Sequence, residues 1–273
     1  MCCVVDSVLK EKLAGHKNMF LSAISLLVFV IVWEFLATSG LTGIPKYVLP
    51  APSGILNEYV NPSTNWPVQI WATLQEVLIG YGLGVSGGIL LAVVLSVSAT
   101  IRNVSYPFLV MIQLVPKIAI APILFLWLGY GILPKLVITF LITFFPMLVD
   151  TLTGLGAVEP EIVDVIHSLR GTRSQEYAKV RLPNSLPYIF SGMKVSTTLA
   201  VTGALVAEYV GAEAGLGFII VTAGYFGSAT LAFAAVLILA VMGISLFLII
   251  SSLERVILPW YTIPREKAKE RKY

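Results

Sequence analysis

Six long apolar stretches dominate the chain. They cover approximately residues 19–38, 70–98, 106–128, 133–155, 186–210 and 230–253. Each is near or above the roughly 20 residues that a helix needs to cross the hydrocarbon core of a bilayer. Lipid offers no hydrogen-bond partners to the backbone, and a closed barrel would show short alternating segments instead. The pattern therefore predicts an all-α membrane protein with about six transmembrane helices.

The composition supports a membrane protein. Of 273 residues, 57% are hydrophobic and 12% are charged, and the mean hydropathy is +0.89, which is far too apolar for a soluble domain of this size. We expect the first stretch to be a retained anchor, because it is membrane-long and no convincing cleavage site follows it. Cys2 and Cys3 are adjacent and lack metal-ligand spacing, and their role stays open. No motif for nucleic-acid binding is present.

Positive charge predicts the orientation. With the N-terminus inside, the cytoplasmic segments hold Lys10, Lys12, Lys17, Arg102, Arg170, Arg173, Lys179, Arg181, Arg255, Arg265, Lys267, Lys269, Arg271 and Lys272. The outer loops hold only Lys46 and Lys135. We therefore expect a cytoplasmic segment at 1–18, a transmembrane domain at 19–260 and a basic cytoplasmic tail at 261–273, with both termini in the cytoplasm.

The second stretch contains a stripe of small residues. Its members are Gly80, Gly82, Gly84, Gly87 and Gly88. Small residues let helix backbones approach closely in lipid, and glycine has no polar side chain to offer a ligand. We expect a role in helix packing.

A charged island at about 158–186 interrupts the apolar runs. Pro160 suits the first turn of a helix, and Gly171 with Thr172 ends that helix before a second amphipathic segment that runs to Pro183. Apolar residues fall on one side of the first helix and polar residues near the other. The apolar set is Ile162, Val165, Ile166 and Leu169, and the polar set is Asp164, His167 and Arg170. A simple solvated loop needs no apolar face, so we expect a docking element.

The island resembles the signature loop of the permease subunits of bacterial ATP-binding-cassette (ABC) importers. That loop has the pattern Glu-Ala-Ala, three residues, Gly, nine residues, then Ile-x-Leu-Pro. In this chain 164–166 stand at the Glu-Ala-Ala position and 180–183, Val-Arg-Leu-Pro, complete the spacing. Arg170 stands where the pattern has glycine, and Gly171 follows it.

The resemblance continues outside the loop and covers about 210 residues, from Tyr47 to Trp260. The similar segments are YVLPAPSGI (47–55), YPFLVMIQLVPKIAIAPILFLWLGYGILPKL (106–136), FFPMLVDTLTGL (144–155), LPNSLPYIFSGMKV (182–195) and VAEYVGAEAGLGFII (206–220). They are similar to permeases for nitrate, sulfonates, taurine, bicarbonate and pyrimidine or flavin vitamin precursors. Which of these solutes is carried is left open.

The resemblance implies the type I ABC importer permease fold with a cytoplasmic coupling helix, in the bacterial inner membrane. It also implies the partners: a second permease copy, with a homodimer favoured over a heterodimer, two cytoplasmic ATPases and an external solute-binding protein. The chain has no G-x-x-x-x-G-K-[ST] loop, so we expect ATP and Mg to bind to the ATPases and no cofactor to bind here. The expected coupling residues are Ile162, Asp164, Val165, Ile166, His167, Leu169, Arg170, Gly171 and Arg173.

Ionisable residues inside apolar stretches are costly and therefore mark candidate transport sites. They are Glu34, Glu76, Lys117, Asp150, Lys194 and Glu208. The deepest candidates for the translocation pathway are Lys117 and Glu208, together with Gln113 one turn before Lys117. A structural role for Lys117, such as an ion pair with Glu208, is the competing hypothesis, because it lies between Pro116 and Pro122.

Two other classes of function are alternatives. An ion-coupled secondary transporter would usually show internal repeats and more spans. A membrane-embedded enzyme would need clustered catalytic residues, yet the only histidines are His16 and His167 in predicted cytoplasmic segments. We therefore expect neither a catalytic nor a metal site.

Overall fold

The computed structural model describes residues 2–40, 43, 45, 48–211 and 213–261, and throughout these the regular structure is helical. The chain divides into two compact units. The first comprises Met1–Thr64 and Thr222–Ala234, and the second comprises Asn65–Val221 and Ala235–Tyr273. The predicted basic tail, 261–273, lies almost wholly outside the described residues.

The first unit contains α1 (Cys2–Ser39), α2 (Pro52–Glu58) and the short helix η1 (Pro62–Thr64). Glu34 of α1 accepts hydrogen bonds from Ser53 N at 3.0 Å and Ser53 Oγ at 2.7 Å, so its carboxylate satisfies a donor in the first turn of α2. The Trp33 ring packs between Phe29 and Phe233. Glu34 thus has a structural task within this unit.

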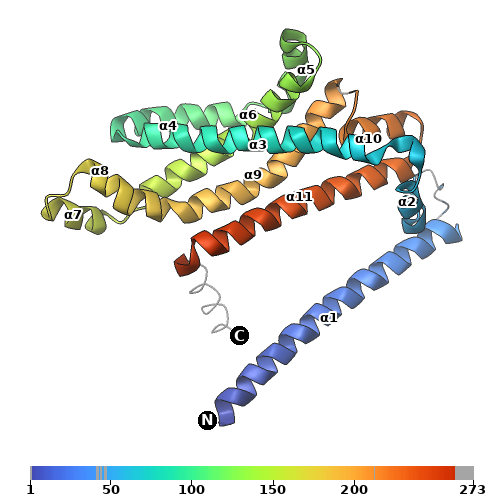
Figure 1. Cartoon of the computed structure of the whole chain (residues 1–273), viewed down its shortest axis with the longest axis horizontal. Coiled ribbons are helices and arrows are strands. Elements are labelled where there is room, and N and C mark those ends of the chain that lie inside the picture. Colours follow the sequence, from blue (N-terminus) through green and yellow to red (C-terminus); the bar gives the residue numbers. More distant parts are fainter. Residues whose placement is uncertain (1, 41–42, 44, 46–47, 212, 262–273) are drawn as a thin grey trace. The chain divides into compact units, whose positions relative to one another are not determined.

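The second unit is built on α3 (Trp66–Ser96), α6 (Ile132–Gly156) and α9 (Leu182–Gly211), which pack against one another (Figure 1). Between them the chain forms α4 (Ala99–Leu114), α5 (Lys117–Leu128), α7 (Pro160–Ser168), α8 (Arg173–Glu176) and the π-helical segment η2 (Tyr177–Arg181). Helices α10 (Leu216–Tyr225) and α11 (Ala229–Ile257) follow, and each contributes residues to both units.

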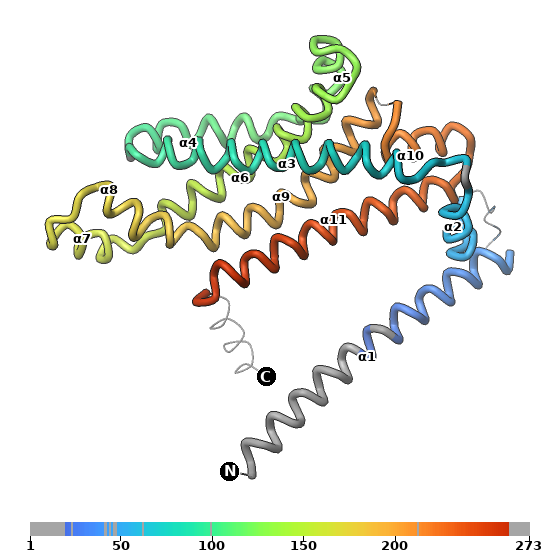
Figure 2. The backbone as a smooth tube through the Cα atoms, in the orientation of Figure 1, coloured from blue at the N-terminus to red at the C-terminus, as the bar shows by residue number. Residues whose placement is uncertain are grey.

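Five helices of the described chain are long and apolar enough to cross a membrane, and the bent pair α4 and α5 makes a sixth span if it is counted as one. The two helices of this pair meet at 82°, a change of direction that can be followed in Figure 2. The span predicted over 106–128 thus consists of two helices with a break between them, and the first of these already begins at Ala99. Pro116 lacks an N–H and forces the preceding Val115 into an extended conformation, with φ −62° and ψ 127°.

Glycines set the distance between α3 and α6. A Cβ atom added at Gly80 would lie 2.5 Å from the side chain of Thr139, and one at Gly84 would fall inside the contact distance of Thr143. One at Gly88 would lie 2.9 Å from the backbone oxygen of Phe144. The packing role predicted for the stripe is thus confirmed for these positions and for Gly87, which faces two phenylalanine rings, whereas Gly82 faces open space.

Glycines also allow α6 and α9 to approach closely. A Cβ added at Gly154 would lie 2.7 Å from Tyr188, and one at Gly203 would lie 3.0 Å from the backbone of Thr139. Thr139 therefore contacts glycines on both neighbouring helices. The three helices form one closely packed group from which the connecting segments extend.

We predict that Gly84→Ala destabilises the protein whereas Gly82→Ala does not. A methyl group at position 84 overlaps Thr143, and overpacking of this kind costs about 1–3 kcal/mol. At position 82 the new methyl group meets nothing, and alanine favours the helix by up to about 1 kcal/mol. Melting temperatures of the two purified variants in detergent measure the difference. Equal melting temperatures would contradict the close contact between α3 and α6.

Candidate functional site

Helix α7 leaves part of its apolar surface uncovered. Ile162 is 46% exposed, Val165 57% and Leu169, at the end of the helix, 75%, whereas the apolar Val163 and Ile166 are half-buried. On its other side, Asp164 and His167 line a cavity of about 430 Å³ between α7 and the adjacent ends of α3 and α6. Three of the four predicted apolar residues are therefore uncovered, and Ile166 is half-buried. The predicted polar residues are exposed as well, and two of them, Asp164 and His167, border the cavity.

A Schellman motif ends α7. The Gly171 N–H donates to Ile166 O at 2.8 Å, and the Arg170 N–H donates to His167 O at 2.9 Å. Arg170 takes the left-handed conformation, with φ 55°, that glycine usually occupies at this position. The position at which the pattern of the signature loop has glycine thus has a glycine-like backbone conformation even though the residue is arginine. Gly171 packs so closely that an added Cβ would lie 2.5 Å from Ile166 Cγ2 and 2.9 Å from Ile166 O.

Thr172 begins α8 with a capping box. Its hydroxyl accepts from Gln175 N at 3.3 Å, and its own N–H donates to Gln175 Oε1 at 2.8 Å. The predicted sequence of helix, turn and second helix is present. One difference is that the second helix continues through η2 into α9.

Glu176 anchors this loop to the transmembrane helices. It is 6% exposed, and it accepts from Arg181 Nε at 2.6 Å and contacts His167 Nε2 at 3.3 Å. Arg181 also donates to Leu155 O of α6 at 3.1 Å, and Tyr177 donates to Ser96 O of α3. We call Glu176, Tyr177 and Arg181 the loop anchor. It holds α7 to the ends of both helices.

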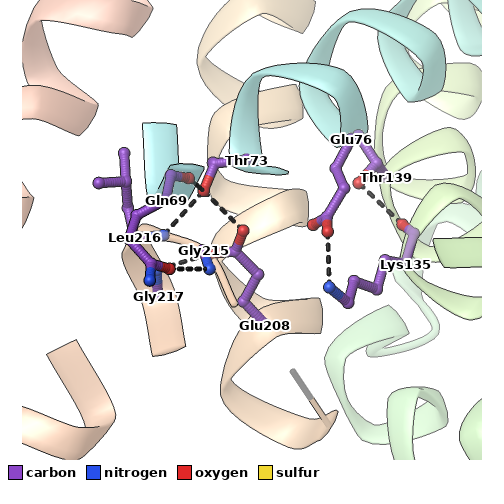
Figure 3. Close-up of polar contacts among 9 residues, drawn as sticks. All are labelled: Gln69, Thr73, Glu76, Lys135, Thr139, Glu208, Gly215, Leu216 and Gly217. Carbon is purple, nitrogen blue, oxygen red and sulfur yellow. Dashed lines mark hydrogen bonds and ion pairs between the residues drawn. The ribbon is translucent and has the colours of Figure 1, made fainter. Parts of the chain in front are cut away.

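A second polar cluster lies at the opposite ends of α3 and α6 (Figure 3). Lys135 Nζ donates to Glu76 Oε1 at 2.6 Å, and both side chains are buried. Lys135 is therefore not an outer-loop residue, as its place at the start of an apolar run suggested, but the partner of a buried carboxylate. Taking one partner away from such a pair would leave an uncompensated charge at membrane depth.

Glu208 belongs to this cluster and is 2% exposed. Its oxygens accept from Thr73 Oγ1 at 2.6 Å and from Gly217 N at 2.5 Å (Figure 3). Leu216 N donates to Thr73 Oγ1, and Gly215 N donates to Gln69 Oε1. These bonds satisfy backbone donors in the first turn of α10, so the cluster joins the start of α10 to α3 and α9.

Lys117 and Gln113 lie at the break between α4 and α5. Lys117 Nζ donates to Gln113 O at 2.7 Å and lies 5.2 Å from the centroid of the Phe145 ring. The ammonium group thus satisfies a carbonyl in the last turn of α4. Among the described residues Lys117 has no carboxylate partner, and the suggested pair with Glu208 is not formed. The structure does not bring the three pathway candidates together.

Comparison with known proteins identifies the family. Residues 84–262 match the family model for the binding-protein-dependent transport system inner membrane component. The formylaminopyrimidine transport permease protein ThiX of Halalkalibacterium halodurans is 34% identical over 237 residues, which are 86% of this chain and 93% of the relative. The chain belongs to this family of ABC importer permeases.

Other relatives of the permease agree. The taurine permease protein TauC of Escherichia coli is 27% identical, with 93% of this chain and 94% of the relative covered. A chain of the MetNI methionine ABC transporter in an inward-facing conformation matches with a TM-score of 0.63 and 19% identity, over 72% of the permease and 99% of that chain. The predicted family, fold and permease function are confirmed, and the secondary-transporter alternative is not favoured.

Sequence reasoning missed the loop anchor and the partnership of Glu76 with Lys135. The anchor residues fall inside a segment read only as amphipathic, and 59 positions separate the members of the buried pair. The sequence did contain one indication of the buried pair: Glu76 and Lys135 carry opposite charges and each lies near the beginning of an apolar stretch.

We predict opposite effects of substitutions at two adjacent positions of the loop. Arg170→Gly should stabilise the turn by about 1 kcal/mol, because glycine enters the left-handed region without the cost that a side chain imposes. Gly171→Ala should open the turn, because its methyl group overlaps Ile166. Hydrogen exchange of the amides at 169–171 reports both changes. Faster exchange in Arg170→Gly would contradict the Schellman motif.

Proposed function

We propose that α7 is the coupling helix through which an ATPase drives this permease. The observation that carries the proposal is the uncovered apolar side of α7: three apolar side chains at helical spacing are exposed, although the segment is too polar to enter lipid. An exposed apolar face on a short helix fits a groove on a protein partner. Ile162, Val165 and Leu169 would fill that groove, with Ile166 and Gly171 supporting the turn.

The loop anchor supports a mechanical role. A displacement of α7 would be passed to α3 through Tyr177 and to α6 through Arg181, because both contacts end on backbone carbonyls of those helices. Closure of the ATPases on ATP and Mg would then rock the closely packed α3, α6 and α9 as a group. In this proposal the ATPases bind the nucleotide, and the permease itself needs no cofactor.

Three polar residues of the loop, which were expected to couple the permease to the ATPase, are proposed to have a structural role. Asp164, His167 and Arg173 line the cavity behind α7, so we propose that they hold the helix in place rather than enter the partner's groove. Arg170 is exposed at the tip of the turn and remains the candidate for a polar contact with the ATPase.

We further propose that both termini are cytoplasmic and that two copies of the permease form the pathway with two ATPases and an external binding protein. The lysine and arginine distribution supports the orientation. Many large apolar side chains of the long helices are exposed, and a second copy of the permease could cover part of this surface. Gln113 and Lys117 at the helix break remain candidates for the pathway, whereas the carboxylate of Glu208 is already satisfied by protein donors.

For the cargo, we propose a small nitrogen heterocycle. Two relatives support this choice: the formylaminopyrimidine permease at 34% identity and the riboflavin transport system permease protein RibX of Chloroflexus aurantiacus at 29% identity. Uptake of labelled formylaminopyrimidine by cells expressing the complete transporter should exceed uptake of taurine. The reverse preference would contradict the proposed cargo and favour a sulfonate, the class of solute to which taurine belongs; the taurine relative is 27% identical.

We predict that Leu169→Asp weakens attachment of the ATPase by about 2–5 kcal/mol, because it places an unpaired charge in an apolar groove. Ser174→Asp is the matched control: it adds the same charge to the same loop, outside the apolar face and near the start of α8. Co-purification of the ATPase with each variant measures the effect. Equal retention by both variants would refute the docking role of α7.

The orientation predicts which side of the membrane reacts with an impermeant thiol reagent. In a background without Cys2 and Cys3, a cysteine at Ser63 should react from outside, and one at Ser174 should react only after the membrane is opened. Both positions lie in short helices between the long ones. Reaction of both positions from the same side would overturn the span count.

A further inference from the structure

Arg102 is a half-buried cation at the junction of two cavities. It lies in the first turn of α4, which follows directly after the end of α3, and Ser98 caps this turn. The guanidinium packs over the end of α6, where a Cβ added at Gly156 would lie 3.3 Å from its Nη1. Within the described chain, no carboxylate or carbonyl pairs with the guanidinium group of Arg102.

The two cavities that meet at Arg102 differ in character. The first is the polar cavity of about 430 Å³ behind α7. The second, of about 550 Å³, runs along α4 and α6, and Tyr106, Pro107 and Leu152 give it an apolar wall. Both cavities are lined by Arg102 and Gly156, so together they form one groove with a charged end and an apolar end.

The charged end has an excess of positive charge. Glu176 is compensated by Arg181 and contacts His167, which leaves Arg102, Arg173 and Asp164 around the polar cavity. None of these three side chains forms an ion pair within the described chain. Two guanidinium groups against one carboxylate favour an anion, and guanidinium groups match the oxygens of a phosphate.

We propose that this groove binds an anionic phospholipid, with its phosphate at Arg102 and an acyl chain along Tyr106, Pro107 and Leu152. Basic pockets between transmembrane helices at the cytoplasmic interface suit anionic headgroups, and a tyrosine near the interface is a frequent neighbour of lipid. A free anion would use the charged end and would leave the apolar wall without a partner. The lipid would fill the space behind α7 and support the coupling helix from the membrane side.

The test uses the full-length permease purified in mild detergent, with no ATPase present, so it can fail independently of the proposed docking. Native mass spectrometry measures the retention of added dioleoyl-phosphatidylglycerol and of dioleoyl-phosphatidylcholine. We expect the wild-type protein to retain phosphatidylglycerol preferentially, and Arg102→Gln to lower its affinity about fivefold or more. Arg102→Lys should retain part of the affinity.

Arg255→Gln is the matched control, because Arg255 is an exposed arginine in the last turn of α11 and lines neither cavity. It should leave the affinity for phosphatidylglycerol unchanged. Tyr106→Ser keeps the charge and should weaken binding by removing the apolar wall. Melting temperatures close to that of the wild type show that the variants are folded.

Three outcomes would overturn the proposal. Equal losses in Arg102→Gln and Arg255→Gln would show that phosphatidylglycerol responds only to total charge. Unchanged binding in Arg102→Gln would show that the groove is not the site. Stabilisation by inorganic phosphate that depends on Arg102 but not on Tyr106 would assign the groove to a free anion instead of a lipid.

Discussion

The close approach of α3, α6 and α9 is the constraint on which the rest of the second unit depends. Lipid tails are as apolar as the side chains they touch, so burial from water does not hold these helices together. Van der Waals contact must do so, and it requires backbones to come near. Gly80, Gly84 and Gly154 allow this, and Thr139 contacts glycines on both partners. Both polar clusters are built across the contacts that result.

The two clusters lie at opposite ends of the same helices and have different designs. At one end, Glu76 and Lys135 pair directly, and Glu208 accepts from the backbone N–H of Gly217 in α10. At the other end, Glu176 and Arg181 connect a loop to the carbonyls of α3 and α6. The first arrangement joins the helices of the group to one another, whereas the second attaches the loop with α7 to them. In the proposed coupling role, the second arrangement would pass a displacement of α7 to the helix group.

The sequence predicted those structural features that depend on residues close to one another along the chain. The apolar runs gave the spans, the spacing of glycines gave the packing stripe, and Pro160 with Gly171 gave the ends of α7. Contacts between distant segments could not be obtained in this way. Lys135 was assigned to an outer loop from its place at the start of an apolar run, and its partner Glu76, 59 positions away, could not be recognised from the sequence. The effect of Pro116 was local, yet its result, an 82° bend, depends on whether neighbouring helices can support a break.

The uncovered face of α7 also bears on how the importer is assembled in the cell. In the proposed coupling role, a permease made without its ATPase would leave Ile162, Val165 and Leu169 exposed in the cytoplasm, where such surfaces are recognised by chaperones and proteases. The same three side chains would thus report whether a subunit has found its partner. Matched synthesis of the two proteins would protect the permease, and an excess of orphan subunits would be degraded.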